Sequence, residues 1–416
     1  MNLINRKEKN IDNFLTKAIW VFLIIFVIGS PFSISLAQMG LVPAIILWII
    51  QIIYRRKKIK GSIIDFPILI YLTGELITSI FCEYSATAFA GYQGEWQILL
   101  LYVVSNTLNI DSAKKLLKIL FIVSIVISIY GLYQHFTGWD IWRHKTLKPR
   151  YNFYDIVGGF GMHLTFGGYF MMIALVGWAY FNKINSKYRI LYIIGTILIT
   201  LATIGSYARS AWIGLLGGAV FLILITGKDK KRVIGSFLLI LVIIGILLNV
   251  GAFRRRFFSM ENILHSRRYQ IWRVALLMIK DHPIIGVGNG NFKRYYPKYK
   301  MEPRKNFPED KVMGHPHNDY LNIYITSGII GLIGYLLMWF IILKKGLQYM
   351  KDKSSANKPL MAGLLSGIVA FMIAGLAQCY FTDSENSMLL WFYISIISLI
   401  LLEEDKIKNK YFPIKM

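Results

Sequence analysis

Long apolar runs recur along the whole chain and are separated by short polar segments. An α-helix needs about 20 apolar residues to cross the roughly 30 Å hydrocarbon core of a bilayer. The hydropathy pattern predicts about twelve such helices. Their expected ranges are 16–36, 38–53, 62–82, 95–109, 116–135, 160–181, 188–206, 210–226, 233–252, 319–343, 358–380 and 386–402. The pattern therefore predicts an all-α integral membrane protein with one polytopic domain over residues 1–416.

The first apolar run also has features of a secretory signal peptide. Arg6 and Lys7 precede it, and Ser35-Leu36-Ala37 gives a small-x-small site near its end. Because residues 18–36 are long enough to span a bilayer, we expect this run to remain as the first transmembrane helix.

The polar segments between the runs indicate the orientation. Lysine and arginine collect in every second short loop, as is typical of cytoplasmic loops. These basic loops are 54–58, 114–115, 183–189, 227–232 and 344–353. The short loops on the opposite side, 82–95 and 382–386, carry neither residue type. The pattern predicts a multi-pass protein of the cytoplasmic (inner) membrane with both termini in the cytoplasm.

Charge changes this picture at two outer segments. The chain as a whole is basic, with 47 Lys and Arg against 22 Asp and Glu. Residues 134–160 hold four Lys and Arg, and the large loop 253–318, between the ninth and tenth expected spans, holds fourteen against five acidic residues. Long loops escape the positive-inside rule, so the orientation stands. The concentrated positive charge on the outer face favours a polyanion as partner, such as a diphosphate, an acidic glycan or a lipid headgroup. The simpler alternative is a basic loop lying on anionic membrane lipids.

The large extracytoplasmic loop is expected to be ordered. It is rich in aromatic residues, unlike a disordered segment. Trp272, Ala275, Leu276 and Ile279 recur at helical spacing, which predicts an amphipathic helix over 266–280. The helix should end at Asp281-His282-Pro283 and lead into a glycine-rich turn at 286–290.

His317 is the candidate general base. It stands in Gly314-His315-Pro316-His317-Asn318-Asp319-Tyr320, directly before the tenth span. A helix N-terminus disfavours the imidazolium form and keeps an imidazole available to take a proton. His315 and Asn318 are candidate supporting residues. A lone histidine is, however, usually structural.

Three arginines are candidate ligands for an anion. Arg209 stands at the outer end of the eighth span, and Arg267 and Arg268 begin the amphipathic helix of the loop. Guanidinium groups bind phosphate oxygens in a bidentate manner. The alternative is a snorkelling anchor at Arg209 and solvated charge at Arg267 and Arg268.

The sequence gives little support for metal or cofactor chemistry. There is no Asp-x-Asp pair in an early outer loop, and Asp383-Ser384-Glu385 reads as a solvated turn. Motifs for nucleotide binding and for serine or zinc hydrolases are missing. We expect no metal, no cofactor and no nucleic-acid partner. Glu75, a carboxylate inside the third span, is a functional candidate without an assigned role. Cys82 and Cys379 lie near outer ends of spans, so a disulfide between them stays open.

Three segments resemble the motifs of the O-antigen ligase family, which includes O-antigen polymerases and some protein O-oligosaccharyltransferases. One segment is similar to the family signature. It begins with His317-Asn318, continues through nine residues and ends with Gly328-Ile329-Ile330-Gly331. Residues 268–288 resemble its loop motif, and residues 206–214 resemble its arginine-containing span start, with Ile213 where leucine is frequent. The resemblance covers roughly residues 200–335.

The resemblance implies a GT-C-like fold of about twelve spans with the active site at the outer face. It implies a glycosyltransferase that is metal-independent and inverts the anomeric centre. The donor would be a glycan on undecaprenyl diphosphate, and the acceptor a glycan or the lipid A core. Arg209 and Arg268 would hold the donor diphosphate, with Arg267 beside them, and His317 would activate the acceptor hydroxyl. The chemistry of the leaving group agrees with these roles, because a departing diphosphate needs fixed cations when no metal is present.

Other functions remain open. The motifs do not separate a ligase from a polymerase that uses a second lipid-linked glycan as acceptor. A transporter of lipid-linked glycans would place polar residues near the midplane, whereas here they gather at the outer face with Glu75 as the exception. A non-catalytic assembly protein would tolerate loss of His317.

Overall fold

The computed structural model describes residues 2–55, 58–150, 152–184, 187–226, 234–235, 267–299, 312–351 and 356–411. Its α-helices are α1 (Asn2–Gly29), α2 (Ile34–Arg55), α3 (Asp65–Phe81), α4 (Ser85–Tyr92), α5 (Leu99–Thr107), α6 (Ile110–Thr137), α7 (His163–Ala179), α8 (Arg189–Gly205), α9 (Arg209–Ile225), α12 (Arg267–Asp281), α13 (Phe292–Tyr299), α14 (Asp319–Lys351), α15 (Lys358–Gly375) and α16 (Ser384–Tyr411). Two 3-10 helices, η1 (Gln93–Ile98) and η2 (Phe181–Lys183), accompany them. The ninth expected span, 233–252, falls outside the described residues except at 234 and 235, as do parts of the large loop.

The described helices fit an all-α membrane protein. Six of them are long and apolar enough to cross a bilayer: α1, α2, α6, α14, α15 and α16. Three shorter apolar helices, α7, α8 and α9, have 17 residues each. The expected span at 95–109 is divided, because η1 precedes the nine residues of α5. The number twelve therefore stays a prediction.

Local signals explain where α6 begins and ends. Asn109 accepts a hydrogen bond from the backbone N–H of Ser112 at 2.8 Å and so caps the first turn. At the other end Gly138 adopts a left-handed conformation with φ of +70°, a usual way to close a helix. Two short antiparallel hairpins follow, β1 (Trp139–Asp140) with β2 (Lys145–Thr146) and β3 (Pro149–Arg150) with β4 (Phe153–Tyr154). Among the residues that the structure describes, these hairpins are the exception to a helical secondary structure.

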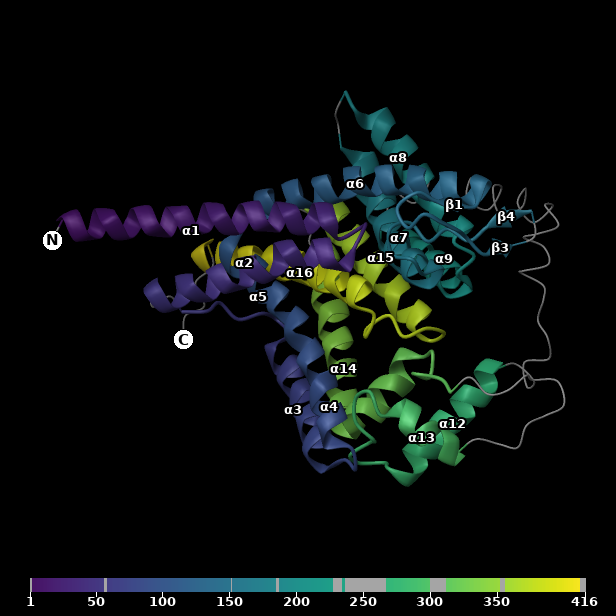
Figure 1. The fold of residues 1–416 in the computed structure, drawn as a ribbon. Coiled ribbons are helices and arrows are strands. Elements are labelled where there is room, and N and C mark those ends of the chain that lie inside the picture. The colour runs from purple at the N-terminus through teal and green to yellow at the C-terminus, as the bar shows by residue number, and fades with distance from the viewer. Residues whose placement is uncertain are drawn as a thin grey trace.

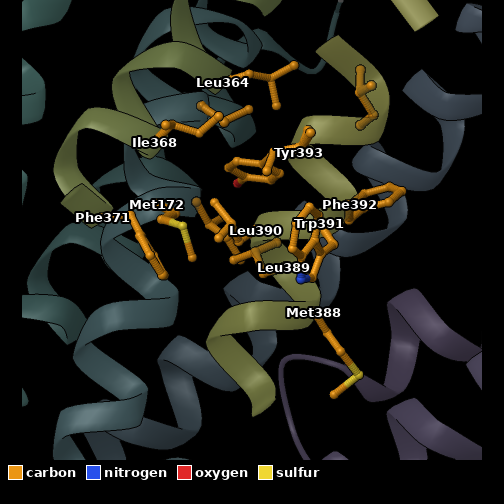
Figure 2. Packing of buried hydrophobic residues seen from close by; sticks show 14 of the residues in the cluster. Met172, Leu364, Ile368, Phe371, Met388, Leu389, Leu390, Trp391, Phe392 and Tyr393 are labelled. Atoms are coloured by element: carbon orange, nitrogen blue, oxygen red, sulfur yellow. The ribbon is translucent and has the colours of Figure 1, made fainter. Parts of the chain in front are cut away.

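The centre of the molecule is built by α16, α15 and α7. In the apolar stretch of α16, 89% of residues are buried, against 28% in α1, so α16 lies inside the bundle and α1 at its edge. Figure 2 shows Met172 of α7 and Leu364, Ile368 and Phe371 of α15 gathered around Leu390 and Tyr393 of α16. A helix that is apolar on all sides suits this central place.

The helices form two groups (Figure 1). α1, α2, α5–α9, α15 and α16 make the larger group, and the loop helices α12 and α13 gather around α3, α4 and α14 in the second. Within the second group, α3 and α14 pack closely because glycines meet. A Cβ atom on Gly74 would collide with the backbone of Gly331.

Helix α14 is broken at Gly328, and the loop turn 284–288 fills the break. Gly328 has φ of +65° and ψ of −170°, a conformation that only glycine adopts readily. The freed backbone groups find partners in the turn. The N–H of Ile329 donates to the carbonyl of Ile284 at 3.1 Å, and the N–H of Val287 donates to the carbonyl of Ile325 at 2.8 Å. Two of the three motifs that carried the family resemblance therefore dock onto each other here.

Candidate functional site

The site is organised around a turn at residues 376–383, between α15 and α16. The residues just before and at the start of α14 hold this turn. The side-chain amide of Asn318 donates to the carbonyl of Leu376 at 2.9 Å, and Asp319 accepts a hydrogen bond from the N–H of Phe381 at 3.0 Å. Asn318 also caps α14, because its Oδ1 accepts from the N–H of Leu321 at 3.0 Å. The 376–383 turn and the histidine segment are thus fixed to each other.

His317 lies half-buried against this turn. Its Nδ1 is 2.7 Å from Oε1 of Gln378, and its backbone N–H donates to Nδ1 of His315 at 3.3 Å. The residue has φ of +52°, which is uncommon outside glycine. Such strain persists only where neighbouring contacts hold it, and it gathers at functional sites. The predicted base is therefore held by contacts at both its ring and its backbone.

His315 packs against His317, with ring centroids 4.3 Å apart. Burial lowers the pKa of His315 to about 4, and the neighbouring imidazole of His317 contributes to the shift. At neutral pH His315 is therefore uncharged and can accept the hydrogen bond from the backbone of His317.

Arg209 begins α9 directly after a tight corner. Tyr207 is fully buried and has φ of +54°, so the chain turns sharply between α8 and α9. The next residue after Arg209 contacts the 376–383 turn, because the hydroxyls of Ser210 and Tyr380 are 2.9 Å apart. Arg209 is half-buried at this junction.

Arg268, in the first turn of α12, is brought to the same place. Burial lowers the pKa of its guanidinium, the positive charge of Arg209 lowers it further, and the Tyr380 hydroxyl opposes the shift. Two half-buried guanidinium groups that repel each other are an arrangement that a bound anion would stabilise. The structure thus joins Arg209 and Arg268 from segments far apart in the sequence. The side chain of Arg267 lies outside the described residues.

Asp383 corrects one expectation. The sequence indicated a solvated turn, but Asp383 is half-buried and accepts a hydrogen bond from the hydroxyl of Thr165 at 2.7 Å. Burial raises the pKa of the Asp383 carboxyl, and the hydrogen bond from Thr165 opposes the shift. Glu385 is half-buried beside it. The end of the turn is therefore attached to Thr165 at the start of α7 and is not fully solvated.

Glu75 belongs to a second polar cluster, beside the break in α14. Its side chain is fully buried, and Oε1 accepts a hydrogen bond from the amide of Asn289 at 2.8 Å. On the next turn of the same helix, Tyr71 donates to Oε1 of Glu95 at 3.1 Å. Asn289 comes from the glycine-rich turn of the large loop. We call Tyr71, Glu75, Glu95 and Asn289 the α3 cluster.

Two further expectations concern cysteines and metal ligands. Cys82 and Cys379 are both free thiols, so the disulfide left open by the sequence is not formed. Among the residues that the structure describes, no three His, Cys, Asp or Glu side chains come together in a group that could hold a metal.

Sequence reasoning missed most of the 376–383 turn. Gln378 and Tyr380 belong to no recognised motif. Both fell inside the expected span 358–380, whereas α15 ends at Gly375 and leaves them in the turn. Their contacts reach 61 residues back to His317 and 170 residues back to Ser210. Such contacts depend on how α9, α14 and α15 pack.

Comparisons with known proteins show which parts of the chain resemble a family and two curated relatives. Residues 194–336 match the family model described as O-antigen ligase. A curated protein named O-antigen ligase from Pseudomonas aeruginosa is 25% identical over 214 residues, which cover 50% of this chain and 48% of the relative. An uncharacterized protein from Haemophilus influenzae is 23% identical over 229 residues, covering 50% of this chain and 56% of that protein.

These matches span about half the length of the curated relatives. The matched region contains Arg209, Arg268 and His317, and it ends beyond the break in α14. The resemblance to the O-antigen ligase family is confirmed over residues 194–336, and the described helices define the class as a helical membrane protein.

Proposed function

We propose that the protein transfers a glycan from undecaprenyl diphosphate to an acceptor hydroxyl at the outer face of the cytoplasmic membrane. The observation that carries the proposal is the junction at the 376–383 turn. Two guanidinium groups meet there, and an imidazole is fixed on the same turn. Two neighbouring cations and an imidazole held by the same turn fit a reaction in which a diphosphate leaves as an oxygen nucleophile attacks.

The residues can divide the reaction as follows. His317 takes the acceptor proton as the acceptor oxygen forms a bond to the anomeric carbon. The bond from that carbon to the diphosphate oxygen breaks, and its electron pair leaves with the diphosphate. Arg209 and Arg268 stabilise the negative charge that develops there. A single in-line displacement of this kind inverts the anomeric centre and requires no metal ion.

The acceptor and the orientation are further parts of the proposal. The name of the Pseudomonas relative favours a ligase, whose acceptor is the lipid A core. A polymerase would instead use a second lipid-linked glycan. The beginning of α1 and the end of α16 lie at the same end of the molecule in Figure 1, which supports placing both termini in the cytoplasm.

The test is glycan transfer by the purified protein in lipid nanodiscs with undecaprenyl-diphosphate-linked glycan, a lipid A core acceptor and excess EDTA. His317→Ala is expected to lower kcat by about 10²–10⁴-fold, and Arg209→Ala or Arg268→Ala by about 10²–10³-fold. Arg273→Ala, on an exposed position of α12, and His144→Ala, in an exposed turn, are the matched controls.

Each outcome is informative. Transfer in EDTA that the three site variants lose and both controls keep supports the proposal. Normal transfer by folded His317→Ala overturns the assignment of the base. Transfer only to a second lipid-linked glycan makes the protein a polymerase. Absence of transfer in nanodiscs together with translocation of the donor in sealed proteoliposomes makes it a transporter.

A further inference from the structure

We propose that Gln378 is a positioning residue that fixes the ring tautomer of His317, so that Nε2 is the nitrogen that accepts the proton. This inference rests on the proposed function, because it concerns how His317 works as a base. No motif pointed to Gln378, and the assignment comes from the contacts of the 376–383 turn.

The first step is the hydrogen bond itself. Nδ1 of His317 and Oε1 of Gln378 are 2.7 Å apart. A carbonyl oxygen only accepts, so Nδ1 must carry the proton and donate it. In a neutral imidazole the other nitrogen, Nε2, then holds the lone pair. The bond therefore selects one of the two tautomers.

The second step is that both partners are held in place. Gln378 is only 5% exposed, and its turn is attached to α14 through Asn318 and Asp319. The backbone of His317 is fixed at positive φ and bonded to His315. Because neither backbone is free to shift, the orientation of the imidazole is determined by the fold.

The third step concerns a neutral partner in place of a carboxylate. A carboxylate at this position would favour the imidazolium and raise the pKa of the base. An amide oxygen selects the tautomer without adding charge. Among the described titratable groups, His315 packs on the ring and the Cys379 thiol lies at the backbone of His317. Asp319 follows two residues later and holds the 376–383 turn through the N–H of Phe381. Replacing Gln378 by glutamate would add a charge directly on Nδ1.

The experiment compares wild type, Gln378→Leu and Gln378→Glu in the nanodisc transfer assay over pH 5 to 9. Gln378→Leu removes the acceptor and replaces the amide by an apolar side chain of similar volume. We expect kcat to fall about 10–100-fold with the KM for the donor unchanged, by analogy with the loss of outer partners of ligating histidines. Gln378→Glu should shift the acidic limb of the kcat–pH profile to higher pH by about one unit. The sign follows because the deprotonated imidazole is the active form.

A second measurement reads the tautomer without activity. The protein is labelled with ¹⁵N-histidine, and the His317 signals are identified by their loss in His317→Ala. Wild type should show a protonated Nδ1 and an unprotonated Nε2. In Gln378→Leu the two tautomers should mix. Gln51→Leu, the same substitution at another buried glutamine whose amide bonds Asp12, is the matched control for both measurements.

The outcomes separate this inference from the proposed function. If His317→Ala is inactive while both Gln378 variants keep the wild-type pH profile and tautomer, the role of Gln378 is wrong and the base stands. If wild type transfers no glycan, the proposed function fails, and if His317→Ala is fully active, the assignment of the base fails. In both cases the ¹⁵N spectra still decide whether Gln378 sets the tautomer. A shift of the profile in Gln378→Glu together with mixed tautomers in Gln378→Leu supports both.

Discussion

The junction at the 376–383 turn and the α3 cluster both place polar groups inside an apolar protein, but with different chemistry. The junction gathers two guanidinium groups and an imidazole from α9, α12 and the segment before α14, all half-buried. The α3 cluster gathers carboxylates, a phenol and an amide, and its Glu75 is fully buried. Half-buried cations are accessible to an anion from outside. In the α3 cluster, the hydrogen bond from Asn289 to the buried Glu75 attaches the loop to α3. This difference in burial predicts a binding role for the junction and a structural role for the α3 cluster.

The largest expected effect on stability concerns α14, the helix that joins the two regions. Gly328→Val places a β-branched residue at positive φ and sets its Cβ against the carbonyl oxygen of Ile284. We expect a loss of about 3 kcal/mol in the free energy of unfolding, from strain and the lost turn contact. The measurement is denaturant unfolding in detergent micelles.

The control is Gly94→Val, because a Cβ atom at Gly94 would have no neighbouring heavy atom within 4 Å. If both valine variants are equally stable, the break in α14 is not held by the loop turn. The comparison between the two regions would then lose its physical link.

The α3 cluster itself should respond more weakly. Asn289→Leu removes the donor to Glu75 and leaves a buried carboxylate oxygen without it. Leaving a buried polar group unpaired costs about 2 kcal/mol. Glu75→Leu combined with Asn289→Leu should recover part of this loss, because both partners are then apolar. Thermal unfolding of the two single variants and the double variant measures the coupling, and simple additivity would argue against the bond.

The smallest effect concerns pH. The pKa of His315 is about 4 in the folded protein, below its usual 6.5. Between these values the unfolded chain binds the proton and the folded protein does not, so stability falls as pH drops from 6.5 towards 4. We expect His315→Phe to reduce this loss by about 1 kcal/mol. Unfolding at pH 7 and pH 5 tests it, and an unchanged difference between the two pH values would contradict the burial of His315.

The sequence predicted the parts of the molecule whose information is local. Apolar runs gave the helical membrane class, and the motifs gave Arg209, Arg268 and His317. The amphipathic helix expected over 266–280 corresponds to α12, Arg267–Asp281. The expected glycine-rich turn has positive φ at Gly286, Gly288 and Gly290. Each of these features depends on residues within a few turns of one another.

What could not be predicted depends on packing between distant segments. Asp383 was read as solvated because nothing nearby indicates that Thr165, 218 residues earlier, bonds it. Glu75 had no role until Asn289, 214 residues later, proved to be its partner. Gln378 carries no motif at all. The roles of His317, the arginines and Gln378 remain predictions for the experiments above.

The short first part of α14 sets the distance between the histidine segment and the break at Gly328. It runs from Asp319 to the break at Gly328, and nine residues of α-helix measure roughly 13 Å. One end carries the histidine segment, and the other is clamped by the loop turn and by α3. Adding one residue between the two ends would lengthen this helix segment by about 1.5 Å and rotate one end against the other by about 100°. The nine-residue interval between Asn318 and Gly328 thus encodes a length and an angle, whatever side chains fill it.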